Sequence, residues 1–120
     1  MKISSAESVV MEALWRQSPL TSEAIMGEVG AANGWTEGTV KQLISRLLKK
    51  KAVAAKADGR RYLYSPLVTR SAYVEAESQG LLDRLFDGRL APLVTHFSQA
   101  DKLSDEDIAE LKALIERIGK

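Results

Sequence analysis

The most constraining feature of the sequence is an apolar repeat between residues 36 and 51. Its apolar side chains recur at i, i+3, i+4, i+7 and i+8, and they are Val40, Leu43, Ile44, Leu47 and Leu48. This spacing predicts an amphipathic helix with one apolar stripe, and the hydroxyl of Thr36 can cap its start. Because the stripe has to be covered, other parts of the chain must pack against this helix.

Two helices are predicted before this repeat. Ser4 and Glu7 have the spacing of a capping box, which indicates that a first helix begins there. Thr21 can cap a second helix over about residues 22–29, and the segment that starts at Gly30 should break it. The residues expected in the buried stripe of this second helix are Ala24, Ile25 and Val29.

A β-hairpin is predicted after the repeat. Asp58 and Gly59 lie between two short segments, and both residue types tolerate the positive φ of a type I′ turn. The segment that follows is rich in tyrosine and leucine, and Pro66 should end it. We therefore expect a two-stranded hairpin with basic residues at its tip.

The sequence becomes helical again from Thr69, with a break near Gly80 or Gly88 and a last helix that opens at Ser104. These helices have no second layer of their own, so they either fold back on the preceding domain or pair with another chain. We favour pairing, because a short tail with an apolar stripe makes a small dimer interface. The candidate dimerisation residues are Leu81, Leu82, Leu85, Phe86, Leu90, Leu93, Val94, Phe97, Ile108, Leu111, Leu114, Ile115 and Ile118.

Positive charge is concentrated in one stretch of the chain. The formal net charge is only +1, but residues 36–70 contain nine basic and two acidic side chains, whereas the segments on either side are acidic. This asymmetry is typical of a face that binds nucleic acid. Charge alone does not distinguish such a face from the solvated lysines of an ordinary helix.

The order of the elements decides in favour of DNA. Three helices followed by a hairpin form a winged helix-turn-helix, in which the third helix lies in the major groove and the hairpin follows the backbone. The face opposite the apolar stripe carries amide, hydroxyl and cationic groups that suit base edges, and basic groups at the helix end and hairpin tip suit phosphates. The candidate DNA-binding residues are Thr36, Gly38, Thr39, Lys41, Gln42, Ser45, Arg46, Lys49, Lys50, Arg60 and Arg61.

The expected architecture is therefore mainly α. A winged-helix DNA-binding domain with a two-stranded wing is expected over residues 1–68, followed by a helical dimerisation region over residues 69–120. The length of 120 residues suits one modest core. No targeting segment or apolar run of membrane-spanning length is found, so we expect a cytoplasmic protein with no membrane insertion.

Catalytic and metal-binding chemistry has little support in the sequence. There is no cysteine, and His96 is the single histidine, so one chain offers no Cys/His pair, serine triad or zinc motif. We expect no enzyme activity, no metal site and no cofactor. An enzyme acting at a dimer interface would depend on two copies of His96 alone.

Four segments resemble the penicillinase repressor family of bacterial transcription regulators, which also includes methicillin-resistance regulators and copper-transport repressors. They are residues 35–50, 59–66, 82–88 and 103–111. The resemblance implies a homodimeric repressor that binds a two-fold symmetric DNA operator through its winged helix. It also implies a membrane-bound sensor protease as a partner. Copper-responsive relatives carry paired cysteines near the carboxyl terminus, and their absence here argues against copper sensing by that route.

The resemblance also suggests a cleavage site. Antibiotic-responsive relatives are cleaved at an asparagine-phenylalanine bond in the dimerisation region, and His96-Phe97 occupies the corresponding place in this sequence. Cleavage between His96 and Phe97 is therefore one hypothesis, and a buried dimer contact for Phe97 is the other.

Together, these features predict a homodimeric, sequence-specific transcriptional repressor. It should bind a palindromic operator through the third helix and the basic wing. The alternative is a winged-helix protein-protein interaction module that uses the same helix and wing to contact an acidic partner.

Overall fold

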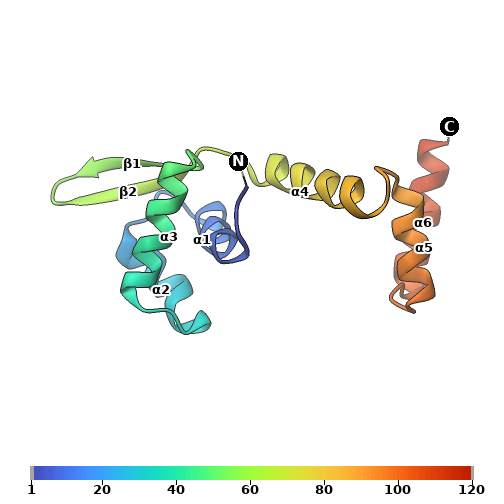
Figure 1. Ribbon diagram of the computed structural model, residues 1–120, viewed down its shortest axis with the longest axis horizontal. Helices are drawn as coiled ribbons and strands as arrows, with labels where there is room; N and C mark the ends of the chain where they lie inside the picture. The colour runs from blue at the N-terminus through green and yellow to red at the C-terminus, as the bar shows by residue number, and fades with distance from the viewer. Residues whose placement is uncertain (1, 120) are drawn as a thin grey trace. The chain divides into compact units, whose positions relative to one another are not determined.

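The computed structural model describes residues 2–119 of the protein. Its elements, drawn in Figure 1, are α1 (Ser5–Arg16), α2 (Ser22–Asn33), α3 (Glu37–Lys49), β1 (Val53–Asp58), β2 (Arg61–Pro66), α4 (Arg70–Leu85), α5 (Leu90–Gln99) and α6 (Asp105–Ile118). Residue contacts divide the chain into two compact units that meet between Val74 and Glu75, within α4. We call residues 2–74 the first unit and residues 75–119 the second unit.

The helices of the first unit begin where the sequence predicts. Ser4 accepts a hydrogen bond from the backbone N–H of Glu7 at 3.1 Å, and the Glu7 carboxylate accepts one from the Ser4 N–H at 2.8 Å, which completes a capping box. The hydroxyls of Thr21 and Thr36 cap α2 and α3 in the same way. Each cap satisfies a backbone donor that the first turn of a helix leaves without a partner.

The core of the first unit lies between α1, α2, α3 and the start of β1. The apolar stripe of α3 is buried as predicted, except that Leu48 is only half-buried. The residues of the most regular apolar pattern in the sequence are therefore part of the core. The buried apolar residues are Ile3, Val10, Met11, Ala13, Leu14, Leu20, Ile25, Val29, Val40, Leu43, Ile44, Leu47, Ala52 and Val53.

The predicted hairpin is present, but its turn differs from the expected one. β1 and β2 pair antiparallel from Val53 opposite Pro66 to Asp58 opposite Arg61, so the two central turn residues are Gly59 and Arg60. Gly59 has a φ of 65°, and Arg60 is not in the positive-φ region. A type I′ turn needs positive φ at both central positions, so the I′ prediction is wrong. A glycine in the first central position fits a type II′ turn.

The prediction for α2 was also partly wrong. The helix continues past Gly30 to Asn33, and Gly34, with a φ of 67°, ends it in the left-handed conformation. Gly30 is buried within the helix, and the end of the Met26 side chain lies beside its Cα atom. Ala24, expected in the buried stripe, is exposed.

A short β-bridge joins the segment between α1 and α2 to the wing. The N–H of Leu20 donates to the carbonyl of Tyr64 at 3.0 Å, and the N–H of Tyr64 donates to the carbonyl of Leu20 at 2.8 Å. The bridge fixes β2 to the helical core on the side of the wing that β1 does not cover. The sequence carried no signal for this pairing.

The second unit contains most of α4, all of α5 and all of α6. α4 passes through Gly80 without interruption, and the break falls at Asp87 and Gly88, which have φ of 52° and 74°. The break is thus at the second of the two glycines that the sequence suggested. Ser104 and Asp107 form a second capping box at the start of α6, as predicted. No described residue of α4, α5 or α6 is buried.

Candidate nucleic-acid interface

The exposed face of α3 carries most of the candidate DNA-binding side chains. Val40, Leu43, Ile44 and Leu47 are buried in the core, so the rotation of the helix is fixed and its opposite face points to solvent. The residues that are exposed on the helix are Glu37, Gly38, Lys41, Gln42, Ser45, Arg46 and Lys49. This face offers an amide, a hydroxyl and three cations at the spacing of successive helical turns, which suits hydrogen bonding to base edges and phosphates.

Two predicted contacts at the start of α3 already have partners. The Thr36 hydroxyl accepts a hydrogen bond from the Thr39 N–H at 3.2 Å, and the two threonine hydroxyls lie 3.2 Å apart. Thr36 is exposed and Thr39 is half-buried. Their immediate effect is to order the first turn of α3, whose exposed N–H groups favour a nearby anion such as phosphate.

Lys41 is paired with the acidic residue of the same face. Its ammonium lies 2.9 Å from the Glu37 carboxylate one turn earlier, and both side chains are exposed. The hydrogen bond and the charge of Lys41 lower the pKa of Glu37, and the same contact raises the pKa of Lys41. Both groups therefore stay ionised near neutral pH. Because the pair is solvated, Lys41 can exchange Glu37 for a phosphate at little cost.

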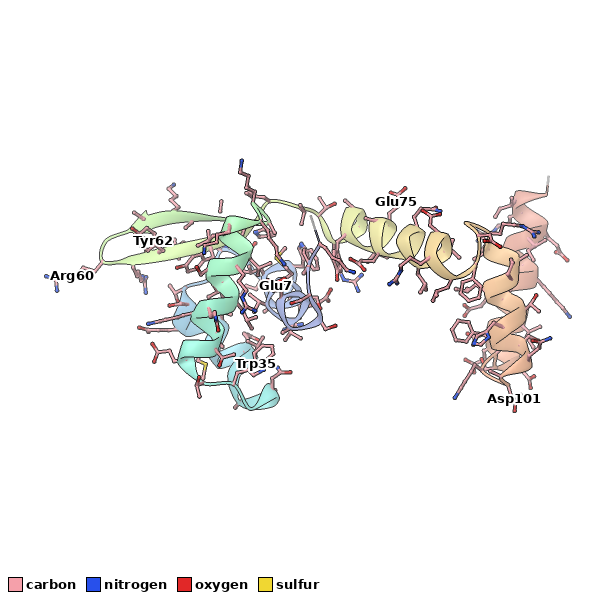
Figure 2. All side chains as sticks on the ribbon, in the orientation of Figure 1. Glu7, Trp35, Arg60, Tyr62, Glu75 and Asp101 are labelled. Carbon is pink, nitrogen blue, oxygen red and sulfur yellow. The ribbon has the colours of Figure 1, made fainter. Side chains whose placement is uncertain are left out.

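The wing supplies two arginines with different surroundings. Figure 2 shows Arg60 at the tip of the hairpin, with its guanidinium directed away from the strands. The Arg61 Nε lies 3.4 Å from Asp58 Oδ2 across the turn, in an exposed ion pair. Arg60 is thus the better placed of the two to reach a phosphate or a minor groove.

A small hollow beside α3 contains residues that sequence reasoning did not assign to the interface. It measures about 200 Å³ and brings Tyr64 of β2 next to the start of α2 and the exposed side of α3. Its lining residues are Ser22, Lys41, Ile44, Ser45, Leu48 and Tyr64. Tyr62 of β2, labelled in Figure 2, is 54% exposed on the wing. No sequence pattern distinguished these tyrosines from ordinary strand residues.

Lys50, which the sequence suggests as a phosphate contact, has partners inside the protein. Its ammonium donates to the Glu7 carboxylate and, at 2.7 Å, to the carbonyl of Lys2. The Glu7 side chain is 1% exposed, so moving Lys50 to a phosphate would leave a buried carboxylate without its counter-ion. The sequence could not reveal this contact, because the two residues are 43 positions apart.

The candidate dimerisation residues of the second unit form exposed and half-buried apolar surface. A groove of about 730 Å³ between α5 and α6 gathers several of them, and it is lined by Leu90, Leu93, Val94, Phe97, Leu103, Asp107, Glu110, Leu111, Ala113, Leu114 and Arg117. Leu85, Ile115 and Ile118 are at least 65% exposed, and Ile108 is 39% exposed. Leu81, Leu82 and Phe86 are half-buried. The described residues of this unit do not bury these side chains themselves.

The candidate cleavage site lies inside a helix. His96 and Phe97 belong to α5, and both are exposed. Their carbonyls accept hydrogen bonds from Ala100 and Lys102 at 3.0 and 2.9 Å. The His96 ring also lies near Phe86, with ring centroids 6.2 Å apart. A protease would have to open this end of α5 before it could bind the His96-Phe97 peptide in an extended form.

Residues 2–119 contain no group of three or more acidic or histidine side chains that could hold a metal ion. No helix in this part of the chain has the length and apolar composition needed to cross a lipid bilayer.

Comparison with known proteins places this arrangement in a family. The sequence profile described as "Penicillinase repressor" matches residues 3–117. The penicillinase repressor of Bacillus licheniformis is 33% identical over 115 residues, which cover 96% of this chain and 90% of that protein. The methicillin resistance regulatory protein MecI of Staphylococcus aureus strain N315 is 29% identical, over 97% of this chain and 94% of that protein.

A solved structure extends the similarity to the winged-helix unit. The solution structure of the monomeric form of Bacillus licheniformis BlaI, in complex with the blaP half-operator, matches with a TM-score of 0.54 and 30% identity. The match covers 61% of this chain and 89% of that chain. It confirms the predicted mainly α, winged-helix fold. The chain belongs to the penicillinase repressor family of DNA-binding transcription regulators, which confirms the resemblance of its sequence and the expectation that it is not an enzyme.

Proposed function

We propose that this protein is a homodimeric, sequence-specific repressor that binds a palindromic operator in double-stranded DNA through α3 and the basic wing. The observation that carries the proposal is the face of α3: its apolar side is buried and its exposed side carries Lys41, Gln42, Ser45, Arg46 and Lys49. The matched BlaI structure is a complex with a half-operator, which supports DNA as the ligand of this face.

The side chains of α3 divide into two roles. Gln42, Ser45 and Arg46 lie on the exposed side of the helix and read base edges in the major groove: Gln42 suits adenine and Arg46 suits guanine. Lys41 and Lys49 neutralise phosphates on either side. Arg60 and Arg61 of the wing contact the backbone or the minor groove next to the half-site.

Dimerisation belongs to the carboxyl-terminal helices in this proposal. We assign DNA binding to residues 1–68 and dimerisation to residues 69–120. The support is the exposed apolar surface of α4, α5 and α6. Contact between this surface and water is unfavourable in an isolated chain. In a two-fold dimer, two copies of α3 enter successive major grooves about 34–36 Å apart on one side of the DNA. The bound dimer then blocks RNA polymerase.

Release of the DNA is proposed to follow cleavage between His96 and Phe97 by a membrane-bound sensor protease. Cleavage would separate α6 from the rest of the dimerisation region. Immunoblotting of induced cells tests this step: shortened chains are expected when the target genes are active. Intact chains in fully induced cells would exclude cleavage as the trigger.

The proposal is tested by binding the purified protein to DNA upstream of its own gene at about 150 mM salt, with random duplex as competitor. A saturable complex that resists the competitor is expected. If that DNA is bound no better than random duplex, selection from a genomic library shows whether an operator lies elsewhere. Failure to select any duplex would leave the protein-interaction module as the function.

The role assignment is tested by three variants on the same duplexes. Arg46→Ala and Gln42→Ala should each cost about 1–3 kcal/mol on the operator and relax the preference at one base pair. Lys49→Ala should weaken operator and random duplex alike and reduce the salt dependence of binding. Equal effects of all three variants on both duplexes would contradict the division into base and phosphate contacts.

A further inference from the structure

Glu7 is an unusual residue in the first unit, because it is a charged side chain in the core. It is 1% exposed, and among residues 2–119 no other charged side chain is as buried. It lies in the first turn of α1 (Figure 2). A buried carboxylate is costly unless hydrogen bonds and an opposite charge compensate it. The groups that pair with Glu7 are therefore needed for the fold around it.

The hydrogen-bonded cluster at Glu7 joins the first residues of the chain to the end of α3. Its Oε1 atom accepts hydrogen bonds from the backbone N–H of Ser4 at 2.8 Å and from the ammonium of Lys50. The same ammonium donates to the carbonyl of Lys2 at 2.7 Å. Two of the three Lys50 N–H donors are therefore used within the protein. The cluster fastens residues 2–7 to the end of α3.

Lys50 occupies the position where α3 gives way to the wing. It is the C-cap residue of α3, and its N–H donates to the carbonyl of Arg46 at 3.0 Å. Lys51 follows in the left-handed conformation with a φ of 61°. The N–H of Ala52 then donates to the carbonyl of Leu47 at 3.0 Å, and β1 begins at the next residue. Contacts that fix Lys50 therefore also fix the end of α3 and the start of β1.

We propose that Glu7 and Lys50 act as a positioning pair for DNA recognition. The pair fixes the end of α3 against α1, and this keeps Gln42 and Arg46 in the orientation that base reading requires. Lys50 acts through this contact and does not bind phosphate. The inference rests on the proposed function, since it assigns a role within the same DNA interface.

A positioning role accounts for a buried carboxylate that is paired with a half-buried ammonium. A buried ion pair adds little net stability compared with apolar residues of the same shape, but it tolerates few geometries. The buried apolar stripe fixes which side of α3 faces the core, but apolar contacts still permit small shifts of the helix along its axis. A single ammonium that must meet the carboxylate of Glu7 and the carbonyl of Lys2 at once permits far fewer.

The test compares a charge-neutral double variant with a variant of the neighbouring lysine. The variants are Glu7→Gln with Lys50→Gln, and Lys49→Gln as the matched control. Each is titrated against random duplex and against a duplex that the wild-type protein selects from a random pool, over a series of salt concentrations. The double variant should lose about tenfold of the preference for the selected duplex, as for one lost base contact, with an unchanged salt slope.

The control should behave in the opposite way. Lys49→Gln should leave the preference unchanged and reduce the salt slope by about 0.9, because one phosphate contact is lost. A double variant that behaves like Lys49→Gln would show that Lys50 is a phosphate contact and overturn the proposal. A folded double variant with unchanged preference and unchanged slope would overturn it too, since the pair would then serve stability alone.

Two further variants keep the test valid if the double variant does not fold. Glu7→Gln alone keeps an acceptor for Ser4 and frees the charge of Lys50. The proposal predicts a reduced preference, whereas a phosphate role for Lys50 predicts tighter binding to both duplexes. Lys50→Arg keeps the ion pair and should retain the preference of the wild type, and its loss would count against the proposal. Failure of the wild-type protein to select any duplex would instead overturn the proposed function itself.

Discussion

The two units of the protein differ in where their apolar side chains lie. The first unit buries fourteen apolar residues, from Ile3 to Val53, and its buried carboxylate, Glu7, is paired with Lys50. In the second unit no described residue is buried, and Ile115 and Ile118 are 65% and 75% exposed. The first unit therefore has the core it needs to fold by itself. The second unit leaves apolar surface exposed, and in the proposed function a second copy of the chain covers it.

This difference matches a division of labour. Reading bases requires side chains held on rigid elements, and α3 is held by a buried stripe, an N-terminal cap and the Lys50 contact at its end. Joining two copies requires surface that stays available until a second chain arrives. In the proposed function, association of the second units is the step that protein concentration controls.

The largest expected difference between the two units is in the free energy of unfolding, when one leucine of each unit is replaced by alanine. Leu47→Ala, at a fully buried position of α3, should lower the free energy of unfolding by about 2–5 kcal/mol. Leu114→Ala, at a position of α6 that is 42% exposed, should leave unfolding of the first unit unchanged. Urea unfolding followed by tryptophan fluorescence reports on the first unit alone, because the two tryptophans are Trp15 and Trp35. Equal losses would show that both units share one core.

The next effect concerns association of the second unit. Leu114→Asp places a charge in the groove between α5 and α6, and it should weaken dimerisation by about 2 kcal/mol or more. The control is Lys112→Asp, one exposed position on the same helix that does not line this groove. Sedimentation equilibrium measures both. Dimers of unchanged strength in Leu114→Asp would remove the groove from the interface.

A pH-dependent effect should be confined to the first unit. Burial of Glu7 acts to raise its pKa, but the hydrogen bonds and charge of Lys50 and the hydrogen bonds of Ser4 outweigh it, so the pKa lies below the ordinary value of 4.5. Folding therefore gains stability from ionised Glu7 above pH 4.5 and loses it as the pH falls through the lowered pKa.

Glu7→Gln reveals this contribution. It should be less stable than the wild type at neutral pH, and the difference should shrink as the pH falls below 4.5. Thermal unfolding followed by tryptophan fluorescence at several pH values gives the comparison. A difference that stays constant down to acid pH would contradict the assigned ion pair.

The smallest expected effects come from the two capping boxes, one in each unit. Ser4→Ala and Ser104→Ala each remove a hydroxyl that caps a helix and should cost about 1 kcal/mol. The loss at Ser4 should appear in the fluorescence transition of the first unit. The loss at Ser104 should appear as weaker dimerisation, with that transition unchanged. Detecting the Ser104 loss in the fluorescence transition would argue against separate units.

The sequence predicted those features that depend on neighbouring residues. The starts of four helices followed from Ser4, Thr21, Thr36 and Ser104, because a cap and its partner are three positions apart. The buried side of α3 followed from its period. The exposed side, which carries Gln42 and Arg46, followed because it lies opposite the apolar stripe.

The features that the sequence missed depend on distant residues or on two competing local signals. The bridge between Leu20 and Tyr64 pairs one residue with one residue, so it has no periodic pattern. In the sequence, Lys50 cannot be distinguished from the other lysines of its basic run. Only the fold brings Glu7 beside it. In α2, the helix ends at Gly34, in the left-handed conformation, and no local rule chose between this glycine and Gly30.

The central claim is that the first unit reads DNA and the second unit joins two copies. The most direct test is the mass of the complex formed by the full chain and the duplex that it selects, measured by native mass spectrometry against excess random duplex. The account predicts two chains on each selected duplex and no persistent complex with the random one. A single chain per duplex, or equal binding of both duplexes, would contradict it.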